Sequence, residues 1–379
     1  MNKSYDAVVV GAGVFGSWIA YHLRKSARSV ALLDQYGPAN SRASSGDESR
    51  ILRMGYGADE VYTRWALRSR ELWMELFDSS GRPELFQETG ALWTPTPTDP
   101  RGAATRATFE KCGVEFEDVS MAELQYRFPQ FLFDSERAAI FELCAGVLLA
   151  RKAVNQVVEA AICSGVEYFR QGATAPESGS IRTSSGDGFR APLFVYACGP
   201  WLPKIFPEVL KDRIRATRQE SFYFGTPIGN RDFAPPKMPA WIDFGDERCP
   251  YVVPEVESRG LKVAFDRHGP EFDPDTGDRL AAGLDGARAF LRERLPALAE
   301  APLVESRVCQ YENTSNGDFL IDRHADFDDV WLVGGGSGHG FKHGPAVGEY
   351  LAQRVDSKLD ENPRFSLATK TVARTRSVY

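Results

Sequence analysis

A glycine-rich turn between an apolar run and a helical segment constrains this chain more than any other part of its sequence. Residues 6–10 are almost entirely apolar and lead into the motif GAGVFG at 11–16, after which a helical pattern continues to about residue 25. A second apolar run at 29–33 ends in an acid, Asp34. Continuously apolar strands on either side of a helix are typical of a buried parallel βαβ unit.

Each glycine of the motif has its own use in such a unit. Gly11 permits the tight turn, Gly13 lets the backbone approach a pyrophosphate, and Gly16 allows helix and strand to pack closely. The amino terminus of the helix then faces the phosphates, and the carboxylate of Asp34 can bind ribose hydroxyls. The pattern predicts a dinucleotide site, with a glycine-rich turn that binds no ligand as the alternative. Its predicted residues are Gly11, Gly13, Val14, Phe15, Gly16 and Asp34.

A second glycine-rich segment, far along the chain, helps to choose between dinucleotides. Apolar residues 330–333 open into GGGSGHG at 334–340, before a helical pattern at about 345–355. The first motif serves NAD and FAD alike. A nicotinamide cofactor does not need a second glycine-rich approach, whereas FAD has both an adenine end and an isoalloxazine end. We therefore expect FAD, with a plain flexible loop at 334–340 and a nicotinamide dehydrogenase as the alternatives.

The rest of the chain alternates helical periodicity with short apolar runs. Residues 193–197 are another continuously apolar run, and residues 85–140 mix short apolar runs with prolines, which indicates strands and irregular connections. From 219 to 265, short aromatic runs bounded by proline and glycine are typical of an antiparallel sheet. The tail after Lys358 is polar, and we expect it to be peripheral. Helical spacing of apolar residues marks 61–77, 146–165 and 285–296.

This order predicts an α/β fold in which the chain enters two domains more than once. The Rossmann-like FAD-binding domain comprises residues 1–84, 141–218 and 309–379. The interleaved antiparallel-sheet substrate domain comprises residues 85–140 and 219–308. We find no internal repeat in the sequence.

Composition narrows the classes of partner and the compartment. The formal net charge is −7 and the 45 Lys and Arg residues are scattered, which indicates neither a nucleic-acid surface nor a polybasic membrane site. No apolar run reaches the roughly 18 residues of a membrane span. Glycines interrupt the first apolar run, so we do not expect it to be a cleaved signal. The six cysteines show no CxxC spacing, which favours reduced thiols and a cytoplasmic protein.

Several motifs together resemble a known family. They are GAGVFG at 11–16, SSGDESRILR at 44–53, CGPW at 198–201, CQY at 309–311 followed by DFLID at 318–322, and GHGFK at 338–342. Through them, nearly the whole chain resembles the D-amino-acid-oxidase-like FAD-dependent oxidoreductases, in the branch of monomeric sarcosine oxidase, pipecolate oxidase and N-methyltryptophan oxidase. The resemblance implies oxidation of a secondary amine or an N-substituted amino acid. We therefore expect hydride to pass from the carbon next to nitrogen to flavin N5, the imine to hydrolyse, and oxygen to be reduced to hydrogen peroxide.

The resemblance also implies which residues hold the cofactor. Cys309 matches the attachment point of flavin through a thioether to the 8α-methyl group, and a thiolate near cations is a good nucleophile toward such a ring. A buried structural cysteine is the alternative. The remaining implied cofactor contacts are Ser44, Ser45, Arg50, Gly199, Trp201, Gly336, Gly338, His339, Gly340 and Lys342.

Five side chains are implied to act on the substrate or on oxygen. Arg53 and Lys342 resemble the family's pair that holds a substrate carboxylate, which suits the planar fork of arginine and the point charge of lysine. Arg50 resembles an arginine beside the flavin ring, and Tyr251 resembles a tyrosine that borders the substrate. Lys262 resembles the lysine at the flavin N5 edge, where a fixed cation stabilises developing superoxide. Ordinary ion pairs, and a solvated strand lysine at 262, are the alternatives.

Other positions depart from the family pattern. Gly46 and Asp266 stand where the sarcosine oxidase branch commonly has histidines, and residues 314–316 alter the TPD motif that follows the flavin-linking cysteine. On a continuing strand, His268 would lie on the same face as Asp266 and partly substitute for the histidine. We therefore assign Asp266 to the catalytic residues and His268 to the substrate-binding residues. An acidic or roomier pocket would favour a cationic amine or a polyhydroxylated group.

The substrate and the electron acceptor stay open at this stage. Pocket shape decides among N-methyl amino acids, pipecolate and fructosyl amino acids. A flavin dehydrogenase with an acceptor other than oxygen, and a flavin-bearing binding or assembly protein without turnover, are further alternatives. The expected partners are a small amine or amino acid and molecular oxygen. We expect no nucleic acid, no membrane, no metal and a monomeric state.

Overall fold

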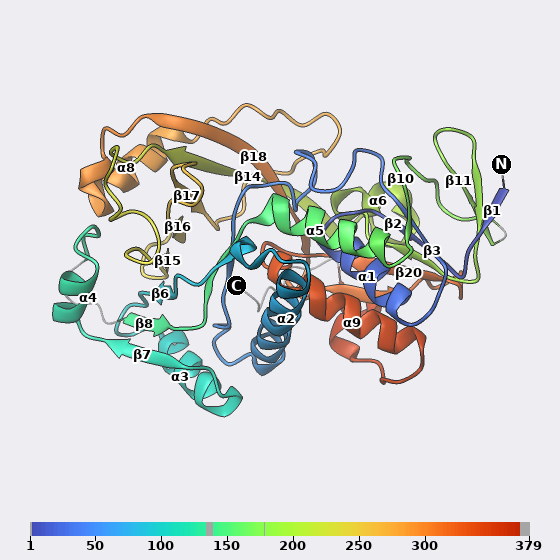
Figure 1. The fold of residues 1–379 in the computed structure, drawn as a ribbon, viewed down its shortest axis with the longest axis horizontal. Coiled ribbons are helices and arrows are strands. Elements are labelled where there is room, and N and C mark those ends of the chain that lie inside the picture. The colour runs from blue at the N-terminus through green and yellow to red at the C-terminus, as the bar shows by residue number, and fades with distance from the viewer. Residues whose placement is uncertain (1, 134–138, 178, 372–379) are drawn as a thin grey trace.

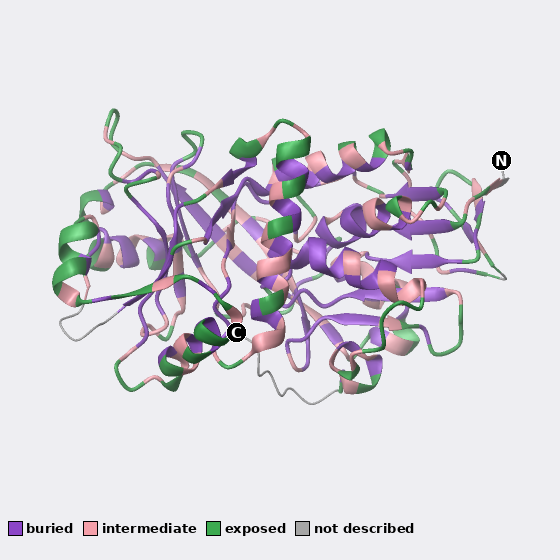
Figure 2. Ribbon diagram, turned by 60° about the horizontal axis from the view of Figure 1, so that its bottom comes forward, coloured by how far each residue is buried: buried purple, intermediate pink, exposed green. Residues whose placement is uncertain are grey.

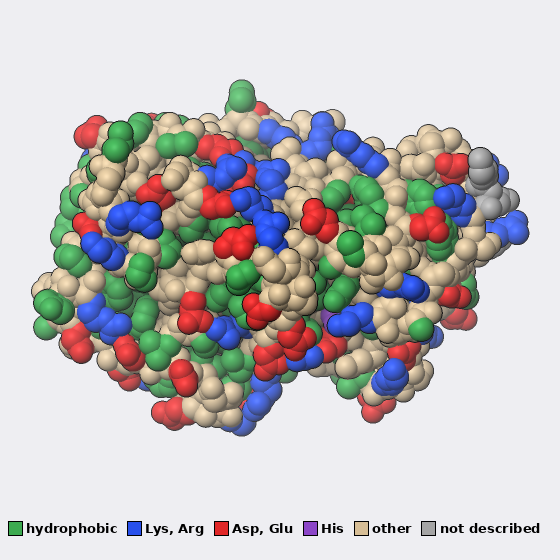
Figure 3. Space-filling view, in the orientation of Figure 1, with side chains coloured by type: hydrophobic (Ala, Val, Ile, Leu, Met, Phe, Trp, Pro, Cys, Tyr) green, Lys and Arg blue, Asp and Glu red, His purple; other side chains and the backbone are tan. Residues whose placement is uncertain are grey.

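The computed structural model describes residues 2–133, 139–177 and 179–371, and two large β-sheets form its framework. A six-stranded sheet lies toward the right of Figure 1, and an eight-stranded sheet lies toward the left. Many residues in the strands of both sheets are buried, whereas most exposed residues lie along the outer faces of the helices and in the loops (Figure 2). On the face shown in Figure 3, acidic and basic side chains are interspersed.

The six-stranded sheet has the strand order β10-β3-β2-β13-β20-β19. Neighbouring strands are parallel except that β19 runs antiparallel to β20. The residues of β2, β3, β13 and β20 are buried, which confirms the predicted continuously apolar parallel strands. The strands are β2 (Ala7–Val10), β3 (Val30–Leu33), β10 (Glu167–Phe169), β13 (Phe194–Tyr196), β19 (Leu320–Arg323) and β20 (Val330–Gly334).

Helices cover this sheet and join it to the rest of the molecule. The first helix, α1 (Val14–Lys25), packs against α5 (Ala150–Cys163) and α9 (Gly344–Val355), which lie on either side of it in Figure 1. The long helix α2 (Glu60–Ser79) packs against α9. It begins after Asp59, whose side chain accepts a hydrogen bond from the backbone N–H of Tyr62, as an N-cap residue does.

The eight-stranded sheet has the order β18-β14-β17-β16-β15-β6-β8-β7. Its neighbours are antiparallel except for the parallel pair β15–β6. The helix α8 (Leu284–Arg294) contributes Phe290 to the apolar cluster beneath this sheet. The strands are β6 (Ala91–Trp93), β7 (Phe116–Val119), β8 (Ala139–Glu142), β14 (Ile214–Phe224), β15 (Ala240–Ile242), β16 (Pro250–Val253), β17 (Leu261–Phe265) and β18 (Leu303–Thr314).

Two small sheets and several short turns complete the described fold. One sheet joins β1 (Asn2–Ser4), β12 (Gly188–Arg190) and β11 (Ser180–Arg182), and the other joins β4 (Arg50–Leu52), β9 (Gly146–Leu148) and β5 (Phe86–Gln87). Short helices are α6 (Leu202–Ile205) and α7 (Pro207–Leu210). Turns of 3-10 helix occupy Pro83–Leu85, Gly199–Trp201, Pro296–Leu298, Phe341–His343, Pro363–Phe365 and Leu367–Thr369.

The structure corrects the expectation of strands and irregular connections alone between residues 85 and 140. Two helices lie there, α3 (Pro100–Cys112) and α4 (Met121–Arg127). Among the buried residues of α3, only Phe109 is strongly apolar, so no apolar stripe marks the helix in the sequence. The sequence nevertheless contains capping residues at the start of each helix. Asp99 caps α3 just before a proline, and Ser120 and Glu123 form a capping box for α4.

Two further expectations change. The helix expected from residue 146 begins at Ala150, because residues 146–148 pair with β4 as strand β9. The tail after Lys358 is not peripheral where it is described, since Phe365 and Lys370 are buried. The part of the tail beyond residue 371 lies outside the described residues.

The long strands β14 and β18 pair along almost their whole length. Both cross a predicted domain boundary, at 218/219 and at 308/309 respectively. Within the described ranges, no helix is both long and apolar enough to cross a membrane.

Candidate active site

The glycine motif leaves β2 in a backbone conformation that few other residues adopt. Gly11 has a φ of +103°, and a Cβ at this position would lie 2.4 Å from the carbonyl oxygen of Ala197. A Cβ on Gly16 would lie 1.8 Å from the carbonyl oxygen of Gly11. The turn therefore packs directly against both α1 and the segment after β13, with no room for side chains.

The amino terminus of α1 is shaped to receive an anion. Gly13 precedes the helix and has no side chain that could cap it, and the first turn contains no acidic residue. The N–H of Val14 donates to Ser45 Oγ at 3.1 Å, which places the loop of residues 44–50 opposite this terminus. The partial positive charge of a helix amino terminus favours phosphate groups at such a place.

Asp34, at the end of β3, holds the turn together. Its Oδ2 accepts a hydrogen bond from the N–H of Ala12 at 2.8 Å. Its Oδ1 accepts from the N–H groups of Tyr36 at 2.9 Å and Gly37 at 2.7 Å. Burial raises the pKa of Asp34, and these backbone hydrogen bonds oppose the rise. The carboxyl group therefore organises the loop as well as facing the cavity described next.

The two glycine-rich segments meet in one cavity, called the first cavity below. At Gly11 and Gly340 a Cβ would lie 2.4 Å and 2.8 Å from other backbone atoms, and the terminus of α1 opens onto the cavity, so its lining fits the elongated, anionic FAD molecule. Gly16 contacts Gly11 and takes the predicted packing position. The predicted cofactor contacts that line the first cavity are Gly11, Gly13, Val14, Phe15, Asp34, Ser44, Ser45, Arg50, Gly199, Trp201, Gly336, Gly338 and Gly340.

A second cavity adjoins the first. Arg50, Tyr311, Gly338 and Phe341 line both cavities. The other predicted site residues that line the second cavity are Arg53, Tyr251, Lys262, Asp266, Cys309, His339 and Lys342.

His268 lies beyond the strand on which its predicted position depends. The strand β17 ends at Phe265, so the alternation that should carry residues 266 and 268 to one face stops before them. The ring of His268 instead lies 6.1 Å from that of Tyr311, measured between centroids.

Arg53 is held between aromatic rings. Its guanidinium carbon lies 4.6 Å from the ring centroid of Trp93 and 4.9 Å from that of Tyr56, and its Nη1 donates to the carbonyl oxygen of Gly55. Glu142, a fully buried carboxylate on β8, accepts hydrogen bonds from the indole of Trp93 and from the N–H of Gly55. Stacking and this scaffold fix the plane of the guanidinium group.

Lys342 is a buried lysine that donates hydrogen bonds to a hydroxyl and to a carbonyl oxygen rather than to a carboxylate of the described chain. Its Nζ donates to the hydroxyl of Tyr56 at 2.7 Å and to the carbonyl oxygen of His339 at 3.1 Å. The Tyr56 hydroxyl also contacts Nε2 of His343 at 2.8 Å and Nδ1 of His339 at 3.1 Å. Burial, reinforced by the charge of Arg53, holds the pKa of Lys342 well below its ordinary value. An anion in the second cavity would relieve this.

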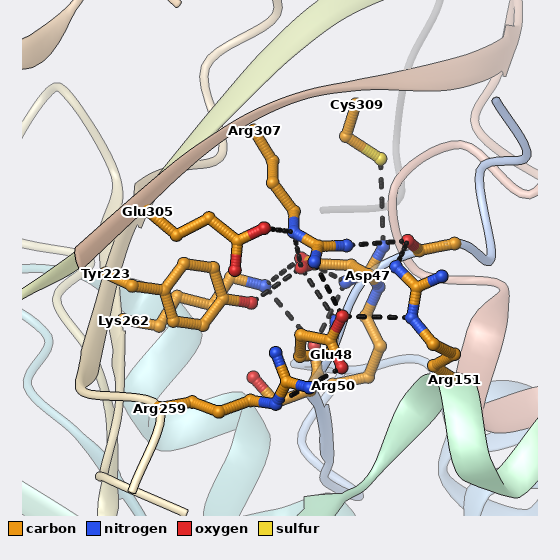
Figure 4. Close-up of polar contacts among 12 residues, drawn as sticks. Asp47, Glu48, Arg50, Arg151, Tyr223, Arg259, Lys262, Glu305, Arg307 and Cys309 are labelled. Carbon is orange, nitrogen blue, oxygen red and sulfur yellow. Dashed lines mark hydrogen bonds and ion pairs between the residues drawn. The ribbon is translucent and has the colours of Figure 1, made fainter. Parts of the chain in front are cut away.

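Lys262 is buried rather than solvated. It lies on β17 with 1% of its surface exposed, and its Nζ donates to Asp47 Oδ2 and to the carbonyl oxygen of Ser49 (Figure 4). Arg50 donates to the same oxygen of Asp47 at 2.6 Å and to the carbonyl oxygen of Ser44 at 3.0 Å. The alternative of a solvated strand lysine is therefore wrong.

Cys309 lies beside a cation of the site. It lies on β18, where its Sγ is 3.7 Å from Nη2 of Arg50 and 3.8 Å from the carbonyl oxygen of Ser44. Cys198 lines the first cavity, but burial raises the pKa of its thiol. Because the thiolate is the reactive form, the position beside Arg50 is the better one for a nucleophile.

Sequence reasoning missed three polar residues that support the site, namely Asp47, Tyr56 and Glu142. Asp47 was visible as an acid within the motif at 44–53, and Tyr56 follows that motif closely. Glu142 gives no local signal, because the backbone groups that it binds belong to residues 54 and 55.

Comparisons with known proteins agree with this arrangement. The FAD dependent oxidoreductase family matches residues 6–354. Human peroxisomal sarcosine oxidase is 29% identical, with 99% of this chain and 97% of the relative covered. N-methyl-L-tryptophan oxidase of Citrobacter koseri is 26% identical, with 96% and 97% covered. L-Proline dehydrogenase from P. horikoshii shares the fold, with a TM-score of 0.84 at 20% identity over 97% of this chain and 98% of its own. Since the family match spans most of its length, the chain belongs to the FAD-dependent oxidoreductases.

Proposed function

We propose that the protein is an oxidase of secondary amines or N-substituted amino acids that uses FAD and molecular oxygen. The observation that carries the proposal is the convergence of Arg53 and Lys342 on a cavity that shares a wall with the first cavity. The buried Lys342 and the half-buried Arg53 favour an anion between them, and a substrate carboxylate supplies it. The relatives are named for sarcosine and N-methyl-L-tryptophan, which are both N-methylated amino acids.

Bound FAD supplies the two-electron redox chemistry that oxidation of a carbon–nitrogen bond requires. The residues of the chain supply orientation and charge. Arg53 and Lys342 hold the carboxylate, which directs the amine toward the wall that the two cavities share. Tyr251 borders the substrate, and Lys262 presents a cation where oxygen acquires negative charge. No side chain has to remove a proton when the amine binds uncharged.

The direct test is anaerobic mixing of the purified enzyme with N-substituted amino acids. We expect sarcosine, N-methyl-L-tryptophan or pipecolate to bleach the flavin absorbance, and oxygen to restore it with release of hydrogen peroxide. Lys342→Met should raise the KM for a carboxylated substrate by about 10- to 100-fold, because it removes one partner of a buried charge pair. Lys370→Met is the matched control, since Lys370 is equally a buried lysine (1% exposed) but lines neither cavity.

Three outcomes would redirect the proposal. Flavin that no N-substituted amino acid bleaches would refute it. Fast bleaching with slow reaction toward oxygen, but rapid reduction of a dye, would make the protein a flavin dehydrogenase. Bleaching by fructosyl amino acids alone would move the substrate to a bulkier, polyhydroxylated class.

We further propose that the flavin is attached covalently through Cys309. Its place in the wall of the second cavity beside Arg50 supports this, as does its match to the family's attachment position. The test is acid precipitation of the protein. Yellow colour should stay with the pellet for the native enzyme and pass to the supernatant for Cys309→Ala. Colour in the supernatant of the native enzyme would leave Cys309 as a structural residue.

The organisation of the chain is a proposal of the same kind. We propose a FAD-binding domain of residues 1–84, 141–218 and 309–379, interleaved with a substrate domain of residues 85–140 and 219–308, in a cytoplasmic monomer. The strands of the six-stranded sheet come from the first set of ranges, and all six cysteines are free thiols. Relatives in bacteria include enzymes called monomeric sarcosine oxidase. Sedimentation of the holoenzyme tests the monomeric state, and cell fractionation tests the cytoplasmic location.

A further inference from the structure

A single carboxylate gathers four hydrogen-bond donors at the border of the second cavity. Asp47 is 3% exposed, and its Oδ2 accepts from Nζ of Lys262 and from Nη1 of Arg50. Its Oδ1 accepts from the hydroxyl of Tyr223 at 2.6 Å and from the N–H of Glu48 at 2.8 Å. Figure 4 shows these side chains converging on Asp47 from different segments of the chain.

Strand register brings two of these donors together. Tyr223 on β14 is paired directly with Lys262 on β17, so both side chains leave the same face of the eight-stranded sheet. Asp47 approaches that face from the loop that precedes β4. Two arginines hold the loop there through Glu48, whose Oε1 lies 2.6 Å from Nη2 of Arg307 and 2.9 Å from Nε of Arg151. The position of Asp47 is thus fixed by its own contacts with the sheet and by the contacts of the neighbouring Glu48 with the two arginines.

We propose that Asp47 is the positioning residue of Lys262: it anchors the ammonium group at the wall of the second cavity and keeps it positively charged. The proposal rests on the proposed function, in which Lys262 supplies the cation for the reaction with oxygen.

The charges around Lys262 explain why it needs Asp47 to stay protonated. Among the described residues, Asp47 is the only carboxylate that forms a hydrogen bond and an ion pair with Lys262. Burial lowers the pKa of Lys262, Asp47 opposes that effect, and Arg50 adds to it. Arginine stays protonated in proteins, so without Asp47 the lysine is the group that gives up its proton. The groups that contact Lys262 or act on its charge include Asp47, Arg50, Tyr223, Tyr251 and Cys309, and the carboxylates of Glu220 and Asp266 line the same cavity.

Asp47 also remains ionised under these conditions. Burial alone would raise its pKa, but Lys262 and Arg50 hold the pKa of Asp47 well below its ordinary value. Removing the charge of one member of such a buried group leaves the others uncompensated. The neutral isostere Asp47→Asn therefore tests the proposal with little change in shape.

The first measurement is the reoxidation rate of the enzyme after reduction with dithionite, which needs no amine substrate. At pH 8 we expect Asp47→Asn to slow reoxidation at least about tenfold, the factor that accompanies one pH unit of titration. The rate should recover at lower pH, where Lys262 regains its proton. The Lys262→Met enzyme should be reoxidised slowly at every pH. Adding Asp47→Asn to it should not slow reoxidation further.

The second measurement is independent of turnover. In enzyme labelled with 13Cε-lysine, the resonance lost in Lys262→Met identifies Lys262. We expect its shift to report an ammonium group at pH 8 in the native holoenzyme, and to change toward the neutral form at a lower pH in Asp47→Asn. If that variant does not fold, the native spectrum decides alone, since a neutral Lys262 at pH 8 overturns the proposal.

A matched control separates this role from general stability. Asp318 is 5% exposed and, like Asp47, accepts from a tyrosine hydroxyl and from an arginine, Tyr62 and Arg364, but it lines neither cavity. Equal slowing by Asp318→Asn, an unchanged titration of Lys262 in Asp47→Asn, or additive losses in the double variant would each overturn the proposal. A failure of amines to bleach the native flavin would refute the proposed function instead, and both measurements would still apply.

Discussion

Replacing Gly16 by alanine has two opposing effects on the free energy of unfolding: a gain in helix propensity and a steric clash. In a helix interior, alanine is favoured over glycine by about 0.8–1 kcal/mol. At Gly16, however, the new Cβ would lie 1.8 Å from the carbonyl oxygen of Gly11 and 2.9 Å from its carbonyl carbon. Since both are backbone atoms, α1 and the glycine turn must move apart by roughly 1 Å or more. Overpacking of this kind costs about 1–3 kcal/mol or more, so the clash outweighs the gain in helix propensity.

Gly286→Ala in α8 is the matched control, because a Cβ there would meet no atom within 4 Å. We expect Gly286→Ala to raise the free energy of unfolding by up to about 1 kcal/mol. Gly16→Ala should lower it by about 1 kcal/mol or more and should also reduce the amount of FAD bound, since the displaced turn forms the first cavity. Urea unfolding and the ratio of flavin to protein absorbance measure the two effects. A Gly16→Ala enzyme with full flavin content and native or greater stability would refute the packing argument.

Three further substitutions test the site and its supports. Arg53→Lys loses the planar fork, so the KM for a carboxylated substrate should rise by about 10- to 100-fold, the equivalent of roughly 1.5–3 kcal/mol. A change of less than about threefold in steady-state assays would show that Arg53 does not bind the carboxylate. Glu142→Gln replaces one accepting oxygen with a donor, so a buried N–H loses its partner and the free energy of unfolding should fall by about 1–3 kcal/mol. Unaltered urea unfolding would contradict this. Burial holds the pKa of His343 well below the ordinary value near 6.5. The unfolded chain therefore binds the extra proton below about pH 6.5 and stability falls on acidification. His343→Gln should make that fall shallower in unfolding experiments at pH 7.5 and 5.5, whereas an identical slope would exclude His343 as its source.

The nucleotide-binding half of the fold was predictable because its signals are local. The glycine spacing at 11–16, the continuous apolar strands and the acid at 34 all lie within one βαβ unit, where each residue's role depends on near neighbours. The helices at 60–79, 284–294 and 344–355 follow from apolar periodicity in the same way. The helix α3 shows the limit of this reasoning, since its buried residues form no apolar stripe.

The second half of the site could be assembled only by tertiary structure. The sequence marks Lys262 through a family resemblance, but nothing near it indicates that its partner is Asp47 or that Tyr223 faces both. Their meeting depends on the register of β14 against β17, and a shift of one residue would turn Tyr223 to the opposite face. His268 illustrates the same dependence, because β17 ends at Phe265 and strand alternation therefore does not relate His268 to Asp266. Local sequence determined which cofactor loop forms, whereas long-range strand pairing and burial decided which charges meet, because those contacts join residues that are distant along the chain.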